Sequence, residues 1–536
     1  MKSEIPKTFR RSVIPALVII CTTILVGVFL VTRDVGNTFL HDDWMFIATR
    51  QNFSLRSLFK SHNGHFSLIP VFIHVLLYKT VGLAQYHVFN LLAPIWHLAT
   101  ALSVGEMVRR RHGLVPAFLG ALLVAVSGVG AENYLWSFQI GFMGALLFFV
   151  LAVMSFDNAV QNNQLRWRFA TLIAISLSLA SSGAGIATLG AMFLLVLSTR
   201  EWRLWWWVVS IPMVIFAGWF ARYGELTGGL RPSITQFLDY IFQGLAGTLS
   251  GMAGVGLGWG KIALGLIAVL VLIDFQRHRF SVRRSIWLIY LLGFWCMTAF
   301  QRAGRYGLFS PLAGRYLWVG TFMFLMIISE VVPKKELRPS SSKLFIIVGI
   351  VLVTAASWES QPLRKDYQNF RRAVATQSMV VHSLALSNRA NIDPKTFIHV
   401  AGWINLDTAA DFFQAVDKFG NPSQLSKQTI IETNSLHGSA DKAMSDLGLL
   451  EIKSVSESCK NIGIRTKVIS VNQGQAQKFL VPDKQTVSIT RFLEPAEAGD
   501  SNKQEISPGV HTVSLASDGF DRPLTLSFDH EIATCD

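Results

Sequence analysis

The first two thirds of the chain alternate between long apolar runs and short polar segments. Most of these runs approach the ~20 apolar residues that a helix needs to cross the hydrocarbon core of a bilayer. We therefore expect an α-helical polytopic membrane protein with about eleven transmembrane helices. The predicted spans are residues 13–32, 87–107, 114–130, 136–156, 169–181, 184–198, 204–221, 258–274, 285–301, 316–332 and 343–358.

Basic residues between the runs indicate how the helices are oriented. Short cytoplasmic loops of membrane proteins carry an excess of Lys and Arg. With a cytoplasmic N-terminus and an uncleaved first span, 19 of the 30 Lys and Arg residues in the first 358 positions fall on the cytoplasmic side, for example Arg109, Arg110 and Arg111. An odd number of crossings then places everything after Trp358 outside the cytoplasm, which predicts a multi-pass protein of the plasma or inner membrane.

Two apolar segments need a different interpretation. A crossing by residues 66–83 would invert every later loop, so we expect them to form a surface helix within a long first external loop, residues 33–86. Residues 169–198 are short for two spans, and we expect a kinked hairpin around residues 181–185. The membrane domain predicted from these patterns covers residues 1–358.

The last third of the chain, residues 359–536, is polar and is expected to form a separate extracytoplasmic domain. A helical pattern is followed by short alternating runs, which predict an α/β or β-sandwich-containing fold. Examples are residues 467–471 and 486–490, with a turn signal at Ser507, Pro508 and Gly509. Cys459 and Cys535 both lie here, and they could form a disulfide in an oxidising compartment if their Cβ atoms approach within ~3.5–4.5 Å.

The charge of the chain becomes informative once it is divided between these parts. A net charge of +14 and a pI near 9.7 would suggest nucleic-acid binding in a soluble protein. However, 51% of the 536 residues are apolar, the mean hydropathy is +0.40, and residues 359–536 carry 18 basic against 21 acidic side chains. The positive charge therefore belongs to membrane loops, so that membrane lipids are expected partners and nucleic acid is not.

Acidic residues in the predicted external loops are the first candidates for chemistry. Asp42 and Asp43 follow the first span closely, and Glu132 lies between the third and fourth spans. Two adjacent carboxylates facing one site could provide a general base or bind a divalent cation. The alternative is a solvated turn with a helix N-cap for the pair, and an interfacial anchor for Glu132. Other titratable candidates in the first loop are His41, Arg50, Lys60, His62 and His65.

A short repeat supplies candidate cations. Residues 303–306 read Ala-Gly-Arg-Tyr, and residues 313–316 repeat the same four letters, with Arg302 adjoining. Guanidinium groups bind phosphate bidentately, and Tyr is favoured at headgroup depth. The repeat therefore predicts a lipid-phosphate site made of Arg302, Arg305, Tyr306, Arg315 and Tyr316. Ordinary headgroup contact is the alternative.

Several familiar signatures are missing from the sequence. It has no Gly-rich phosphate loop, no His/Cys set with zinc spacing and no G-x-S-x-G nucleophile elbow. No motif therefore identifies a metal site or a cofactor, and binding of a divalent cation by the acidic residues stays open. Ionisable residues inside the spans, which ion-coupled transport uses, are also scarce.

The order of features in residues 1–112 resembles that of the GT-C superfamily of membrane glycosyltransferases. Protein mannosyltransferases, aminoarabinose transferases and arabinosyltransferases are similar over this stretch. The resemblance rests on a first span, Asp42-Asp43-Trp44, the turn and surface helix beginning His65-Phe66-Ser67-Leu68-Ile69-Pro70, Gly82-Leu83, and a second span opening Tyr86-His87-Val88-Phe89-Asn90-Leu91-Leu92 and ending Arg109-Arg110-Arg111. Phe66-Ser67 stands where many members have Arg-Pro. The resemblance is loose over the remaining spans and does not extend to the C-terminal domain.

The resemblance implies transfer of a single sugar from a polyprenyl-phosphate donor to a glycan, lipid or protein acceptor at the outer face of the membrane. It implies Asp42 or Asp43 as the general base and Glu132 as a second acidic position. Nucleotide sugars are absent outside the cytoplasm, so the sugar must arrive on a lipid phosphate, and cations such as Arg305, Arg315 and Lys60 would stabilise that leaving group. The outer domain is expected to bind or orient the acceptor.

Two other functions remain open from the sequence. The first is a glycan ligase or phosphotransferase that moves a larger group from a lipid carrier. The second is a polysaccharide or lipid transporter with an outer accessory domain, which would require ionisable residues along a pathway through the spans.

Overall fold

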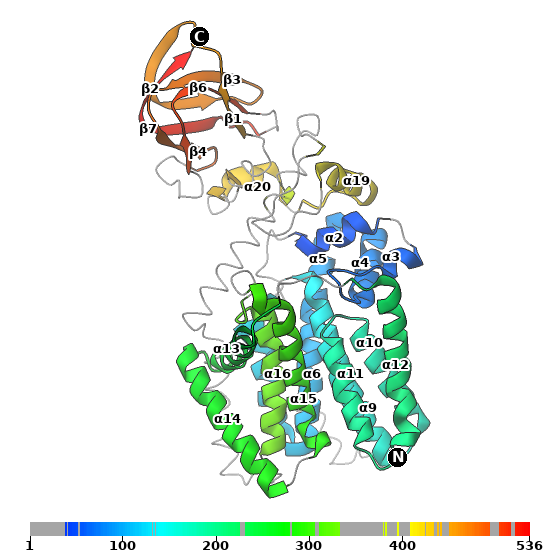
Figure 1. Ribbon diagram of the computed structural model, residues 1–536. Coiled ribbons are helices and arrows are strands. Elements are labelled where there is room, and N and C mark those ends of the chain that lie inside the picture. Colours follow the sequence, from blue (N-terminus) through cyan, green and yellow to red (C-terminus); the bar gives the residue numbers. More distant parts are fainter. Residues whose placement is uncertain are drawn as a thin grey trace, which may run out of the picture. The chain divides into compact units, whose positions relative to one another are not determined.

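The structure is a computed structural model in which the first part of the chain is helical and the last part is rich in strands (Figure 1). The two predicted spans at residues 13–32 and 343–358 lie outside the described residues, as does Tyr306. The described residues are 38–39, 41–51, 54–130, 132–133, 136–225, 231–278, 281–305, 310–332, 379, 381–382, 394–395, 408–423, 425–433, 437–438, 440–441, 450–493, 503–515 and 520–535.

The chain divides into two compact units. Unit 1 comprises Met1–Asp34, Phe53–Ile73 and Val88–Asn369, and unit 2 comprises Val35–Asn52, His74–His87 and Phe370–Asp536. Unit 2 therefore combines the C-terminal part of the chain with two segments of the predicted first external loop.

Unit 1 is a bundle of apolar helices. Many of its long helices lie side by side, for example α15 and α16 (Figure 1). Three tryptophans, Trp287, Trp295 and Trp318, are fully buried in its core. The helices are α3 (Leu55–Phe59), α6 (Leu92–His112), α7 (Leu114–Val126), α9 (Ile140–Asn162), α10 (Leu165–Leu179), α11 (Gly185–Leu197), α12 (Trp202–Tyr223), α13 (Ile234–Ala253), α14 (Leu257–His278), α15 (Val282–Arg302) and α16 (Gly314–Val331), with the 3-10 turns η2 (Gly128–Gly130), η3 (Ser137–Gln139) and η4 (Ala303–Arg305).

Six described helices are long and apolar enough to cross a membrane, so the expected count of about eleven is not supported. The six are Leu83–His112, Ser137–Asn162, Trp202–Tyr223, Leu257–His278, Val282–Arg305 and Gly314–Val331. Three other predicted spans are helical but short, because α7, α10 and α11 have 13, 15 and 13 residues. At 1.5 Å per residue such helices reach roughly 20 Å, less than the ~30 Å hydrocarbon core. The structure also has a helix that the apolar runs did not predict, α13, which opens with a capping box between Ser233 and Gln236.

Ion pairs join the bundle at the ends of its helices. Arg283 at the start of α15 donates to Asp157 near the end of α9 at 2.7 Å, and Arg111 at the end of α6 pairs with Glu330 at the end of α16 at 2.6 Å. Arg284 donates to Asp274 of α14 at 2.7 Å. These charges therefore lie at helix ends and pair with one another across five helices.

The predicted surface helix is shorter than expected. Helix α4 covers Leu68–Thr80 rather than residues 66–83, and the 3-10 turn η1 (Leu83–Gln85) and α5 (Tyr86–Asn90) follow it. Gly82 separates α4 from η1 because it takes φ +78°, a left-handed conformation that favours glycine. The boundary between the two units falls within α4.

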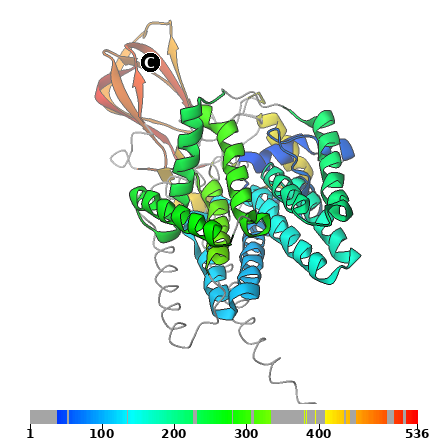
Figure 2. The same cartoon turned by 60° about the horizontal axis from the view of Figure 1, so that its bottom comes forward.

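Unit 2 consists of short helices and one antiparallel sheet (Figure 2). The strands have the order β1-β6-β3-β7-β4-β5, and β2 pairs with β7. The predicted runs at residues 467–471 and 486–490 are confirmed as parts of β2 and β4. The elements are α2 (His41–Thr49), α19 (Ala409–Phe419), α20 (Lys427–Glu432), β1 (Leu450–Val455), β2 (Ile462–Val471), β3 (Ala476–Val481), β4 (Gln485–Thr490), β5 (Lys503–Ile506), β6 (Gly509–Leu515) and β7 (Leu524–Cys535).

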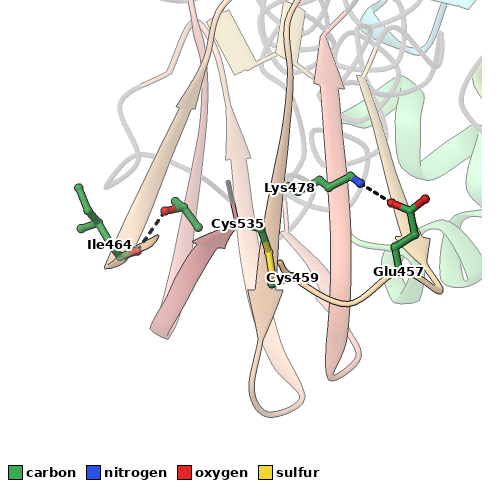
Figure 3. The surroundings of a disulfide bond; sticks show 6 residues. Glu457, Cys459, Ile464, Lys478 and Cys535 are labelled. Atoms are coloured by element: carbon green, nitrogen blue, oxygen red, sulfur yellow. Dashed lines mark hydrogen bonds and ion pairs between the residues drawn. A yellow bond between two sulfur atoms is a disulfide. The ribbon is translucent and has the colours of Figure 1, made fainter. Parts of the chain in front are cut away.

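A disulfide joins the end of the last strand to the loop before β2. Cys459 and Cys535 are bonded with their Cα atoms 5.2 Å apart, which confirms the predicted pair (Figure 3). An ion pair between Lys478 and Glu457 lies in the same region (Figure 3). A disulfide of this kind is typical of an oxidising compartment.

Removing this disulfide should destabilise the sheet. We expect Cys459→Ser/Cys535→Ser to lower the free energy of unfolding by about 2–4 kcal/mol, because the bond closes a loop of 76 residues and restricts the unfolded chain. Pulse proteolysis of the full chain across a urea series would measure the change. Cys296→Ser, which removes an exposed free thiol, is the control and should change stability by less than about 0.5 kcal/mol. Equal midpoints for both variants would contradict the prediction.

Candidate active site

The predicted acidic pair lies in the first turn of a short helix. Asp42 and Asp43 belong to the first turn of α2, and both are buried, with 7% and 0% of their surfaces exposed. The alternative for this pair was a solvated turn with a helix N-cap: the pair does lie at a helix N-terminus, but it is buried rather than solvated. Negative charge is favoured at a helix N-terminus, where the backbone N–H groups point outward. The helix thus compensates in part for the loss of water around the two carboxylates.

A histidine contacts the second carboxylate. His74 Nε2 lies 3.5 Å from Asp43 Oδ1, and the His74 side chain is itself almost completely buried. The Phe46 ring, one turn after Asp43 on α2, packs edge-on against the imidazole at 5.4 Å. An aromatic ring on one side and a carboxylate on another restrict the rotamers of His74. Asp43 and His74 therefore form a fixed, buried pair between α2 and α4.

A second polar contact lies further along the same two helices. The Tyr78 hydroxyl donates to the Arg50 carbonyl at 2.6 Å, and both side chains are buried. Tyr78 follows His74 by four residues and so lies on the same face of α4, and Arg50 directly follows the last residue of α2. Burial lowers the pKa of Arg50 and raises the pKa of Tyr78 from their ordinary values. Arg50 still carries its charge at neutral pH because guanidinium titrates far above it.

Sequence reasoning found one partner in each contact and missed the other. Asp43 and Arg50 were candidates in the first loop, whereas His74 and Tyr78 were hidden in an apolar helix with the sequence Leu-Ile-Pro-Val-Phe-Ile-His-Val-Leu-Leu-Tyr-Lys-Thr. The signal that could have found them is the spacing of two polar groups by four residues. Such a pair projects from one side of a helix that is otherwise apolar there.

In unit 1, two other predicted site residues are brought together. The Glu132 carboxylate forms a largely buried ion pair with the Arg315 guanidinium, and it also accepts the Arg315 backbone N–H at 3.1 Å. Glu132 therefore neutralises the Arg315 cation. Because Arg315 lies in the first turn of α16, Glu132 also accepts one of the backbone N–H groups that have no partner within the helix. Arg315 was predicted to bind a phosphate, and Glu132 is a competing anion for that role.

The remaining members of the predicted phosphate site are placed differently from one another. Arg302 is half-buried at the end of α15, and Arg305 is exposed in η4. Tyr316 is only 2% exposed and lies in the aromatic core, with Trp295 6.4 Å away in an edge-on arrangement. The expectation that Tyr316 faces lipid headgroups is therefore wrong, because its ring packs inside the bundle.

The histidines of the first loop form a tight turn in unit 1. His62 and His65 exchange two backbone hydrogen bonds, of 3.1 and 2.9 Å, across Asn63 and Gly64, both of which have positive φ. This is the Asn-Gly geometry of a two-residue hairpin. The His62 ring contacts Phe138 at 5.2 Å, and Lys60 before the turn is exposed. This turn and the acidic pair belong to different units, although they are close in sequence.

The described residues contain no group of three or more His, Cys, Asp or Glu side chains placed to hold a metal ion. Unit 2 contains the two buried carboxylates of Asp42 and Asp43, the second of which contacts a histidine. Unit 1 contains the Glu132–Arg315 ion pair and two further predicted arginines, Arg302 in α15 and Arg305 in η4. The first group can accept and hold a proton. The second can stabilise negative charge.

Comparison with known proteins adds no relative from which a role could be transferred. No protein-family model matches the chain, and no curated protein matches it. The function has to be argued from these residues and their contacts.

Proposed function

We propose that the protein is a membrane glycosyltransferase that moves one sugar from a polyprenyl phosphate to a glycan, lipid or protein acceptor outside the cytoplasm. The observation that carries the proposal is the buried carboxylate pair on α2, with Asp43 supported by His74 at 3.5 Å. Buried carboxylates are costly to desolvate, and a helix turn that buries two of them is a candidate for proton chemistry.

The topology supports a donor that stays in the membrane. A first span that crosses from a cytoplasmic N-terminus would place the first loop on the outer side, and any odd total of crossings would place the C-terminal sheet on the same side. The disulfide between Cys459 and Cys535 supports the same side for the sheet, since such bonds persist in oxidising compartments. A sugar delivered there as a lipid phosphate needs no nucleotide.

The two carboxylates would then have different roles. Asp42 is 7% exposed and Asp43 is completely buried, so Asp42 is the carboxylate that an acceptor hydroxyl can approach. Asp42 would take the proton of that hydroxyl while the hydroxyl oxygen forms a bond to the anomeric carbon. The bond from that carbon to the phosphate oxygen breaks, and polyprenyl phosphate leaves with the electron pair. Asp43, held by His74, would fix the position of the helix turn that carries Asp42.

The leaving phosphate requires cations close to the membrane surface. Besides Arg315, which is paired with Glu132, the candidates are Arg302 at the end of α15, Arg305 in η4 and Lys60 after α3. Guanidinium groups suit a phosphate oxygen on which charge develops. In this proposal Arg302 and Arg305 contact the donor phosphate, and Arg315 shapes the loop around Glu132.

The positions of the other charges support an enzyme over an ion-coupled transporter. The ion pairs of Arg111, Arg283 and Arg284 lie at helix ends, on the predicted cytoplasmic side. Transport of that type uses ionisable groups within the membrane. Among the Asp, Glu, Lys, Arg and His side chains of the described spans, His97 lies nearest the middle of its span, and it forms hydrogen bonds with the Ala125 carbonyl and Trp318.

The products distinguish the proposed function from its competitors. Purified protein incubated with radiolabelled polyprenyl-phosphate sugars and cell-envelope acceptors should release free polyprenyl phosphate and add one sugar to the acceptor. Mass spectrometry of both products measures the stoichiometry. Release of a diphosphate would identify a ligase instead, and flux across proteoliposomes without a new glycosidic bond would identify a transporter.

A further inference from the structure

The C-terminal part of unit 2 contacts the helix that carries the acidic pair. On α19, Phe412 packs against Trp44, the residue directly after Asp43, with ring centroids 4.8 Å apart. Phe419, two turns later, packs against Tyr78 at 4.7 Å. A single helix from the C-terminal part therefore contacts both α2 and α4, between which Asp43 and His74 meet.

The same segment holds the chain on either side of α2. Before the helix, the Thr38 hydroxyl donates to the Pro422 carbonyl at 3.0 Å in a buried hydrogen bond. After the helix, Lys418 Nζ donates to the Gln51 carbonyl at 3.0 Å. Residues 408–422 are here called the α19 segment. They thus contact the chain before α2, one face of α2 and the chain after it, although α2 is only nine residues long.

Close backbone contact extends to the end of α4. A Cβ atom added to Gly82 would lie 2.7 Å from the Phe419 carbonyl oxygen, closer than any real Cβ contact. Gly82 also has φ +78°, so a larger residue there would be strained as well as crowded. The turn after α4 is therefore fitted to the last residue of α19.

The α19 segment has its own strong helix signals. Thr408 and Asp411 form a reciprocal capping box at its start, and Gly420 with φ +96° ends it. Ala409, Phe412 and Ala415 are buried at helical spacing. Such a helix can serve as a rigid support, because its ends and apolar face are specified locally.

The sheet, by contrast, offers no aromatic platform for a sugar. Sugars commonly stack their C–H faces on exposed aromatic rings, yet the sequence has no Trp or Tyr after Trp403. All four Phe residues of residues 450–536 are buried, namely Phe479, Phe492, Phe520 and Phe528. The contribution of the C-terminal part to the site is therefore better explained by its contacts with α2.

We infer that the α19 segment is a positioning element that holds the acidic pair in its reactive place. This inference rests on the proposed function and extends it, because it makes the C-terminal part a component of the catalytic unit. Positioning matters since a displacement of about 1 Å in a catalytic group can lower a rate ~100-fold. The positioning residues are Thr38, Phe412, Lys418 and Phe419, with Gly82 as the site of closest approach.

Two matched pairs of variants test the inference. Gly82→Ala places a methyl group against the Phe419 carbonyl, whereas Gly113→Ala has a similar positive φ of 84° and meets no atom within 4 Å. Thr38→Val removes the hydroxyl that bonds Pro422, whereas Thr80→Val removes an exposed hydroxyl that bonds only carbonyls of its own helix. The isosteric Thr38→Val keeps the test usable if Gly82→Ala does not fold.

Two measurements are needed for each variant: kcat and KM for sugar transfer, and amide hydrogen exchange in residues 41–51. We expect Gly82→Ala and Thr38→Val to lower kcat about 10- to 100-fold with little change in KM, and to speed exchange in α2 about 10-fold. Gly113→Ala and Thr80→Val should do neither. Unchanged kcat in the first pair, or equal effects in both pairs, would overturn the inference. Absence of transfer by the unmodified protein would overturn the proposed function, and exchange would still decide whether the α19 segment supports α2.

Discussion

Replacing Asp42 with Asn is expected to lower the rate of sugar transfer by about 10²–10⁴-fold, the usual contribution of a general base. The amide has nearly the same shape and can stay in the first turn of α2, but it cannot accept a proton from the acceptor hydroxyl. The measurement is kcat with a saturating lipid-phosphate sugar, together with the expression level and thermal midpoint of each variant. Because the helix N-terminus tolerates Asn well, folding should be retained.

Two further variants separate the roles of the carboxylates. Asp43→Asn keeps Asp42 but weakens the contact with His74, so we expect a smaller loss than for Asp42→Asn, and the double variant should be inactive. Asp239→Asn is the control, because Asp239 is an exposed carboxylate on α13 that accepts a hydrogen bond from Gln243. Near-normal turnover by the double variant would remove the acidic pair from the mechanism. A greater loss for Asp43→Asn than for Asp42→Asn would exchange their roles.

Local patterns predicted elements well where one periodicity dominates. The alternation in residues 486–490 became β4, and the long apolar run in residues 136–156 became α9. The predicted number of spans is not supported, because runs of moderate length, such as residues 184–198, resemble spans although the helix there has 13 residues. An apolar run indicates that a segment avoids water, but a short apolar helix can be buried in protein as well as in lipid, so the run alone does not identify a span.

Contacts between distant residues were beyond local patterns. Asp43 was a candidate for its charge, but its partner His74 is one polar residue within an apolar helix. Glu132 and Arg315 were each candidates, for different reasons, and they are 183 positions apart. A single sequence shows which side chains carry charge. It does not show which of them pair, because pairing depends on how the helices pack. The same applies to the α19 segment, whose helix signals are local but whose contacts with α2 are not.

Glu132 gives the second large expected effect, on stability. Replacing Glu132 with Ala would leave the Arg315 guanidinium largely buried without its carboxylate, and removing one partner of a buried ion pair typically costs 3–5 kcal/mol. It would also leave the backbone N–H of Arg315 without its acceptor. We therefore expect a loss of about 3–5 kcal/mol in the free energy of unfolding, measured by denaturant titration of the full chain in detergent.

The exposed ion pairs of Glu106 provide the matched control for this effect. Its carboxylate pairs with Arg109 and Arg110 while remaining 32% exposed, so Glu106→Ala should cost less than about 1 kcal/mol. A double variant, Glu132→Ala with Arg315→Met, removes the buried cation and should recover part of the stability lost by Glu132→Ala alone. If Arg315 instead served mainly to hold the donor phosphate, Glu132→Ala would leave stability nearly unchanged and tighten donor binding, because a competing anion would be gone. Stability and donor affinity, measured together, therefore distinguish two roles for the Glu132–Arg315 pair. Either the pair shapes the loop, as its double contact with the start of α16 implies, or it regulates access of a phosphate to Arg315.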